Sequence, residues 1–319
     1  FSALANDIIA RAVFGPGRCV KQREYLRELE KVTALVSGFS LVDLFPSWKL
    51  VRLLGSGERR MRRSYGRIRR IIQGIILQRK EEVRATAGSS HEEDFLDVLL
   101  RLQEEEDSLA FPLASEAIGV IIYDVFAGAT ETSRITIEWA MSELVKNPRA
   151  MAKAQLEVRK VLGQQGGVIT NNDLGDLHYM RMVIKEVLRA REDCEIMGYK
   201  IPKGTDVNVN VFAISRDTRY WDAPEAFEPE RFENGNIDYK GTHFEFTPFG
   251  AGRRQCPEML FGMSTVEITL ANLLYHFDRA ISYGVSSESL DMSEKFGINM
   301  CRRYDLQLTA IPYVHSKAL

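Results

Sequence analysis

The spacing of apolar residues along the chain predicts a protein built mainly from α-helices. Apolar side chains recur at intervals of three and four, as on one face of a helix, over residues 1–14, 22–37, 58–84, 94–106, 115–146, 174–191 and 259–277. The stripe of 58–84 consists of Ile68, Ile71, Ile72, Ile75 and Ile76. Between two of the helices, Asn147 is the expected N-cap and Pro148 the expected first helical residue.

Strand patterns follow in the second half of the chain. Residues 195–201 and 206–211 flank Pro202-Lys203-Gly204, which predicts a β-hairpin. Residues 217–248 are rich in loop residues, and the tail from 296 to 312 alternates as strands do. With no repeat and no clean linker, the expected fold is a single domain over 1–319, mainly α with small β-sheets.

Composition limits the possible classes of function. With 319 residues, of which 45% are apolar, the chain can bury a large core. Its net charge of -2 gives no global sign of nucleic-acid binding. The cysteines Cys19, Cys194, Cys256 and Cys301 are widely spaced, which argues against a zinc site or a disulfide framework and fits a reducing compartment. No segment has the pattern of a signal peptide or a membrane span.

An arginine-rich stretch needs its own interpretation. Seven arginines fall between positions 59 and 70 of a predicted helix. The simplest interpretation is a solvated helix face. A surface for a membrane or an acidic partner is the alternative, and nucleic acid fits less well because Tyr65 is the only aromatic residue there.

The segment Phe249–Pro257, FGAGRRQCP, is the strongest candidate for chemistry. It places Cys256 behind a glycine-rich loop and two arginines, just before a long apolar helix. Near a helix N-terminus, free N–H groups and the macrodipole favour the thiolate form of a cysteine. A thiolate can ligate a metal, and haem iron is one metal held by a single cysteine. The alternative is a buried structural cysteine after a glycine-rich turn.

Two further patterns involve charged and hydroxyl side chains. Glu186 and Arg189 are three residues apart on one helix face and can pair, and Arg231, in a proline-rich loop, could join them. In the segment 127–133, AGATETS, small residues would let a flat cofactor approach the helix. There the hydroxyl of Thr132 can bond back to a carbonyl, and Glu131 offers a path for protons. The alternatives are an exposed ion pair and an ordinary small-residue packing face.

Taken together, these motifs resemble the cytochrome P450 family. The spacing Phe-x-x-Gly-x-Arg-x-Cys matches its haem-binding loop, and the other two patterns occur upstream in the family's order. The resemblance implies haem (heme, iron protoporphyrin IX) as cofactor, with Cys256 as the iron ligand. It also implies cofactor contacts from Phe249, Gly252 and Arg254, the last to a haem propionate.

The family resemblance also assigns roles to residues outside the loop. It implies that Glu131 and Thr132 are catalytic and deliver protons during oxygen activation. It further implies that Glu186, Arg189 and Arg231 form a structural cluster that supports the cysteine loop.

The sequence around the motifs, for example Met197–Thr205 and Tyr220–Trp221, is similar to that of plant microsomal members of specialised metabolism. Such a resemblance implies a monooxygenase that inserts one atom of O₂ into a small lipophilic substrate, for example a terpenoid. Its electrons would come from NADPH through a cytochrome reductase, on the cytosolic face of the endoplasmic reticulum membrane. The alternative is a non-catalytic member of the family that does not bind haem productively.

Three departures from the family pattern bear on these expectations. The resemblance begins about a third of the way into a complete member, so the cytochrome P450 fold is expected to be incomplete, without the N-terminal third and its membrane anchor. The short step from Arg189 to Cys194 suggests an internal deletion of a family loop. Glu258 occupies a position that is usually glycine, and its charge should make the iron harder to reduce.

Overall fold

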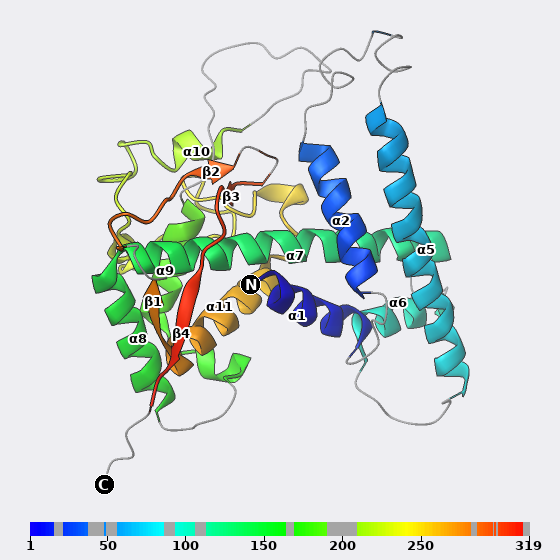
Figure 1. Ribbon diagram of the computed structural model, residues 1–319, viewed down its shortest axis with the longest axis horizontal. Coiled ribbons are helices and arrows are strands. Elements are labelled where there is room, and N and C mark those ends of the chain that lie inside the picture. The colour runs from blue at the N-terminus through cyan, green and yellow to red at the C-terminus, as the bar shows by residue number, and fades with distance from the viewer. Residues whose placement is uncertain are drawn as a thin grey trace. The chain divides into compact units, whose positions relative to one another are not determined.

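In the computed structural model, the described part of the chain comprises residues 1–15, 22–37, 48, 56–85, 93–105, 113–163, 169–189, 209–281, 286–295, 297 and 299–314. Helices dominate it (Figure 1). The α-helices are α1 (Ser2–Phe14), α2 (Gln22–Ser37), α5 (Ser56–Ala85), α6 (Phe95–Glu104), α7 (Ser115–Lys146), α8 (Pro148–Leu162), α9 (His178–Arg189), α10 (Val211–Ile214) and α11 (Met259–His276). Short 3₁₀ helices are η2 (Asn171–Leu174), η3 (Pro229–Phe232) and η4 (Gly252–Arg254). The helical periodicity therefore predicted most of the long elements to within a few residues.

The strands are short and lie near the C-terminus. β1 (Phe277–Ile281) pairs antiparallel with β4 (Leu308–Pro312), with Phe277 opposite Pro312 and Ile281 opposite Leu308. β2 (Glu294–Lys295) pairs with β3 (Cys301–Arg302). These pairs confirm the mainly α fold with small sheets and the strand prediction for the tail.

Three local predictions need correction. The helix expected over 174–191 begins only at His178, because Thr170 and Asp173 form a capping box that starts the separate short helix η2. The hairpin expected over 195–211 lies mostly outside the described residues, but Val211 begins helix α10. Asn147 does precede α8, but its side chain donates to the carbonyl of Glu143 at 2.9 Å and does not cap the helix.

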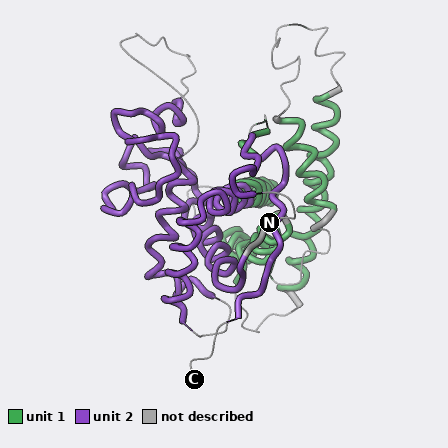
Figure 2. Tube along the Cα trace, turned by 60° about the vertical axis from the view of Figure 1, so that its left-hand side comes forward, with its two compact units in different colours: residues 1–132, 294–301 green, residues 133–293, 302–319 purple. Residues whose placement is uncertain are grey.

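The described chain falls into two compact units, and the division lies within α7 after Thr132 (Figure 2). Unit 1 comprises residues 1–132 and 294–301. Its core is formed by the apolar faces of α1, α2, α5, α6 and the first part of α7, including Ile9, Tyr25, Ile72 and Phe126. Figure 1 shows α2 beside α5, and the two helices are in contact.

Buried charges join the helices of unit 1. Glu28 of α2 is buried and accepts from Lys31 at 2.7 Å and from Arg67 of α5 at 2.9 Å. Arg79 of α5 is buried too, and its guanidinium pairs with Asp97 and Asp94 at the start of α6. Because each buried charge has a partner of opposite sign, the apolar faces can close around them.

The arginine-rich face of α5 agrees with the simplest interpretation of its sequence. All seven arginines between 59 and 70 are exposed, while Ile68, Ile71 and Ile72 on the other face are buried. Among the helices of the described ranges, none is long and apolar enough to cross a membrane.

Unit 2 comprises residues 133–293 and 302–319 and contains the cysteine loop. Its core packs the second part of α7 with α8, α9 and α11, including Leu144, Val183 and Leu270. The carboxylate of Glu157, on α8, accepts from the backbone N–H groups of Tyr179 and Met180 at 2.7 and 2.9 Å. It therefore caps the first turn of α9, whose opposite end contains Glu186 and Arg189.

Candidate functional site

The cysteine loop is closed by its own backbone. The N–H of Cys256 donates to the carbonyl of Phe249 at 2.9 Å, and the N–H of Gly250 donates to Thr247 at 2.9 Å. Gly250 and Gly252 have φ values of +73° and +75°, in the left-handed region that glycine enters without a steric penalty. The glycines of the motif are therefore what let the chain fold back so that Cys256 meets Phe249.

The loop exposes one side to solvent. Residues 250–254, including Gly252 and Arg254, are exposed, whereas Cys256 is half-buried. Phe249 is also partly buried, and its ring meets that of Tyr239 edge-on with centroids 5.7 Å apart. The loop is therefore partly buried at Phe249 and Cys256, and its exposed outer rim, residues 250–254, contains the guanidinium of Arg254.

Helix α11 begins at Met259, so Pro257 and Glu258 separate Cys256 from the first helical residue. The carbonyl of Glu258, the N-cap, accepts from Gly262 at 2.8 Å. The thiol therefore precedes the helix by three positions, slightly further from the helix start than the sequence suggested.

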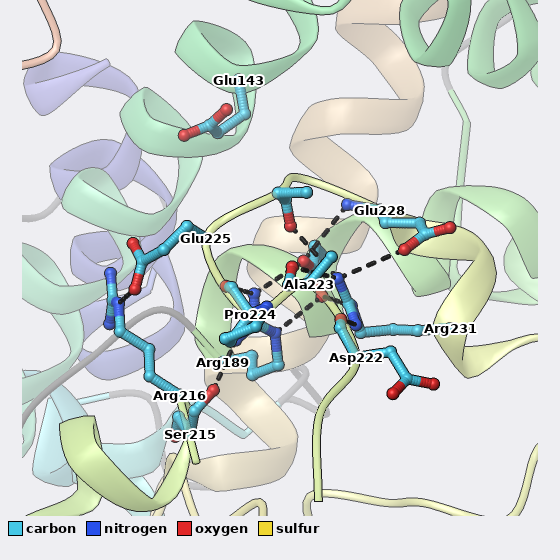
Figure 3. Close-up of polar contacts among 12 residues, drawn as sticks. Glu143, Arg189, Ser215, Arg216, Asp222, Ala223, Pro224, Glu225, Glu228 and Arg231 are labelled. Atoms are coloured by element: carbon cyan, nitrogen blue, oxygen red, sulfur yellow. Dashed lines mark hydrogen bonds and ion pairs between the residues drawn. The ribbon is translucent and has the colours of Figure 1, made fainter. Parts of the chain in front are cut away.

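A buried ionic cluster lies at the C-terminal end of α9 (Figure 3). Arg189 donates to both carboxylate oxygens of Glu186, at 3.0 and 2.9 Å. The Nε of Arg231 lies 3.0 Å from Glu186 Oε2 as an ion pair. The Glu186 side chain is 1% exposed, and those of Arg189 and Arg231 are 3% and 8% exposed. The structure thus brings together the three residues that the sequence grouped.

Backbone carbonyls satisfy the rest of the two guanidinium groups (Figure 3). Arg189 donates to the carbonyls of Ser215 and Pro224. Arg231 donates to those of Asp222, Ala223 and Ala226. The cluster therefore ties the end of α9 to the loop segment 215–231 through carbonyl contacts that the sequence motif did not reveal.

The middle of α7 contains the other predicted site residues. The hydroxyl of Thr132 is exposed and donates to the carbonyl of Gly128 at 2.7 Å, the back-bond expected for a threonine within a helix. Glu131 is half-buried, and its carboxylate accepts from the thiol of Cys301 on β3 at 3.7 Å. No sequence signal pointed to Cys301, because 170 residues separate it from its partner.

The donor set suits a flat cofactor bound through one thiolate. Across the described ranges, no group of three or more His, Cys, Asp or Glu side chains could hold a metal ion. A single cysteine ligand needs no such group, because the porphyrin nitrogens of haem supply four of the other iron ligands. Gly250 and Gly252, exposed and without side chains, belong to the same closed loop as the half-buried free thiol of Cys256. The residues present therefore fit haem on the cysteine side.

These features define a haem-thiolate protein, and the comparisons agree. The family model described as Cytochrome P450 matches residues 1–302, and the chain belongs to the cytochrome P450 family. Haem is accordingly the cofactor of this fold.

Relatives among curated proteins come from plants. The chain is 45% identical to desmethyl-deoxy-podophyllotoxin synthase of Sinopodophyllum hexandrum, over 96% of this chain and 63% of that protein. It is 42% identical to ent-isokaurene C2/C3-hydroxylase of Oryza sativa subsp. japonica, over 98% of this chain and 64% of that protein. The chain thus spans somewhat less than two thirds of these relatives. The similarity supports the prediction of a plant member of specialised metabolism.

A solved structure of a zebra fish cytochrome P450 with abiraterone is similar in fold. The TM-score is 0.74 at 22% identity, over 97% of this chain and 70% of that chain. The expected cytochrome P450 fold is thereby confirmed, over part of the length of a family member.

The alignment with the rice hydroxylase bears on the expected internal deletion. It extends over 331 positions, more than the 319 residues of the chain, so the relative has residues with no counterpart here. The suspected position after Arg189 lies outside the described residues, and its placement stays a prediction.

Proposed function

We propose that this chain is the haem-thiolate part of a monooxygenase that inserts one atom of O₂ into a small lipophilic substrate. The observation that supports this most directly is the geometry of the cysteine loop, in which the Cys256 N–H closes on Phe249 beneath an exposed glycine rim. When bound, haem supplies the redox chemistry that activates O₂. The protein supplies the ligand, the orientation of the cofactor and the protons.

On the cysteine side, Cys256 is the proposed axial ligand. Gly252 has no side chain, and in the described part of the chain no atom beyond its chain neighbours lies within 4 Å of its Cβ position. We propose that this open position lets a flat group approach the backbone of the loop. The exposed guanidinium of Arg254 is the proposed partner of a propionate, because a charged pair of this kind is favourable at a solvent-facing edge. Phe249 closes the apolar base of the loop against Tyr239.

On α7, Glu131 and Thr132 are the proposed proton carriers. The Thr132 hydroxyl can exchange its bond to Gly128 for one to a bound molecule, since it is exposed. Glu131 can accept a proton from solvent because its carboxylate is only partly buried. The thiol of Cys301 limits the orientations of this carboxylate. Proton delivery by the Glu131 carboxyl group and the Thr132 hydroxyl group would be general acid catalysis.

The cluster of Glu186, Arg189 and Arg231 has a structural role in this proposal. Its five carbonyl contacts hold the segment between residues 215 and 231 against α9. That segment precedes the cysteine loop along the chain, so the cluster is proposed to fix the part of the chain from which residues 232–248 lead to the loop.

The substrate and partners are inferred from family membership. One relative is named for hydroxylation of ent-isokaurene at C2/C3, which favours a lipophilic skeleton such as a terpenoid or another plant specialised metabolite. Electrons from NADPH through a membrane-bound reductase of the endoplasmic reticulum complete the proposal, since family members of this type take them from such a partner.

A reduced carbon monoxide difference spectrum of the purified, haem-reconstituted chain tests the proposal. We expect a thiolate-type Soret band that is lost in Cys256→Ala. The matched control is Cys301→Ala, which removes the other cysteine of the described part and should keep the band. Retention of the band in Cys256→Ala would overturn the ligand assignment. A haem-free parent chain would instead identify a non-catalytic member of the family.

A further inference from the structure

Gly241 occupies a turn that lies directly against the cysteine loop. Its φ is +84°, in the left-handed region. A Cβ at this position would lie 3.1 Å from the carbonyl oxygen of Gly250, 3.2 Å from the Cα of Ala251 and 3.0 Å from Nε2 of Gln255. Non-bonded carbon atoms normally rest about 3.5–4.0 Å apart. Two of the three contacts are with backbone atoms, which cannot rotate aside as a side-chain end can.

The segment 237–243, which contains this turn, is anchored on both sides. Lys185 of α9 donates its Nζ to the carbonyl of Ile237 at 2.8 Å. Within the segment, the N–H of Asp238 donates to Nδ1 of His243 at 3.0 Å. Tyr239 packs its ring on Phe249. These contacts hold the segment 237–243 in place, so it cannot easily move away from the cysteine loop if Gly241 gains a side chain.

A displacement at Gly250 and Ala251 would reach Cys256. The loop between Phe249 and Cys256 is closed by the hydrogen bond from the Cys256 N–H to the Phe249 carbonyl. Gln255 also contacts Met259, the first residue of α11, through a bond of 3.6 Å from Nε2 to the sulfur. Because the loop is short and closed by this hydrogen bond, a shift of the backbone at Gly250 and Ala251 also shifts Cys256.

We propose that Gly241 is a positioning residue, whose lack of a side chain sets the conformation of the cysteine loop and hence the place of the Cys256 sulfur. The inference rests on the proposed role of Cys256 as haem ligand. It adds a residue outside the FGAGRRQCP motif to the set that holds the thiolate.

The chain contains a matched control for this proposal. Gly235 also has a positive φ, +66°, but within the described part no atom beyond its chain neighbours lies within 4 Å of its Cβ position. Gly235→Ala therefore introduces left-handed backbone strain without a clash. Gly241→Ala introduces strain of the same kind together with the clash, so the difference between the two variants isolates contact with the loop.

The first test measures the thiol itself and needs no haem. In a full-length chain with Cys19, Cys194 and Cys301 replaced by serine, Cys256 is the sole thiol, and its reaction rate with a chromogenic disulfide reagent is recorded. We expect Gly241→Ala to raise this rate about fivefold or more, because the loop opens more often, and Gly235→Ala to leave it unchanged. Equal rates in the two variants would overturn the proposal.

The second test uses the haem-reconstituted chain. Gly241→Ala should lose the thiolate-type Soret band of the reduced carbonyl complex, while Gly235→Ala keeps it. Before haem is added, circular dichroism should show that both variants are folded. A thiolate-type band of parent intensity in Gly241→Ala would contradict the proposal. If the parent chain shows no such band, the proposed function fails, and the thiol rates still decide the role of Gly241.

A further variant covers the case in which Gly241→Ala does not fold. Tyr239→Leu removes the ring contact with Phe249 and adds no side-chain volume to the segment 237–243. It should raise the Cys256 reaction rate in a folded chain. A parental rate in Tyr239→Leu would then overturn the proposal.

Discussion

Glu186 brings two arginine side chains together near the candidate site. Its carboxylate faces the guanidinium groups of Arg189 and Arg231 and accepts from the backbone N–H of Glu228 at 3.2 Å. A buried carboxylate between two arginines is stable only as a complete set, because each charge compensates the desolvation of the others. The cost of losing one member is therefore far larger than for an exposed ion pair.

This difference can be measured with two glutamates that face the same arginine. Glu186→Gln leaves the buried guanidinium of Arg189 without a counter-charge and that of Arg231 with only the exposed Glu228, and should lower the free energy of unfolding by about 3–5 kcal/mol. Glu228, whose side chain is 53% exposed, lies 3.5 Å from Arg231, and Glu228→Gln should have little effect. Chemical denaturation of both variants and the parent provides the values. Similar losses in the two variants would show that the cluster does not act as a buried unit.

At the scale of elements, the pairing of α2 with α5 depends on one charge as well as on apolar contacts. Tyr25 and Val32 of α2 contribute to the core that includes Ile68 and Ile72 of α5. Between them, the Lys31 ammonium, with help from Ser64 and Arg67, lowers the pKa of Glu28 from 4.5 to about 2, although burial opposes this shift. The helix pair is therefore expected to respond to acid.

The sign of that response follows from the direction of the shift. Above pH 4.5 the carboxylate is ionised in both states, and its favourable interactions in the folded state contribute fully to stability. As the pH falls from 4.5 toward 2, the unfolded state takes up the proton first, and this contribution is lost.

Glu28→Gln tests this element-scale prediction. The variant should be less stable than the parent above pH 4.5, and the difference between them should shrink as the pH approaches 2. The control Glu30→Gln, on the exposed side of α2, should follow the parent at every pH. Urea unfolding at a series of pH values measures the difference, and a constant gap between parent and Glu28→Gln would contradict the assignment.

At the scale of the whole molecule, the chain forms two compact units, and each contains some of the residues named above. Cys256, Arg254 and the ionic cluster belong to unit 2, whereas Glu131 and Thr132 are at the end of unit 1. Each unit has its own buried apolar core. A bound cofactor is expected to act on the stability of the chain as well as on its chemistry.

Haem addition should therefore stabilise the chain through Cys256. Free haem at about one hundred times its dissociation constant should add about 2.7 kcal/mol to the free energy of unfolding. The Cys256→Ala chain should gain much less at the same concentration, since it lacks the proposed iron ligand. Thermal unfolding over a haem titration measures both, and equal stabilisation in parent and variant would indicate binding that does not involve the thiolate.

Much of the fold was predictable because helix formation depends on local pattern. The isoleucine stripe of α5 and the apolar face of α9 were visible in the sequence. Most of these residues are buried as expected, and Ile75, Val187 and Leu188 are partly buried. The start of α9 was not predicted correctly, because the Thr170–Asp173 capping box formed a separate turn that competes with the apolar periodicity. The motifs likewise predicted which charged residues would meet, because their spacing on a helix and their order along the chain constrain the possible partners.

The sequence by itself determined the family, the helical class and the cysteine on which the proposed chemistry depends. Only the tertiary structure decided which backbone carbonyls complete the ionic cluster, that Cys301 meets Glu131, and that Gly241 lies so close to the cysteine loop that a side chain there would meet it. These contacts join positions far apart along the chain, and neither periodicity nor a motif encodes the distance between such positions. They depend on how the elements pack, because close packing holds specific atoms from distant parts of the chain at van der Waals or hydrogen-bond distance.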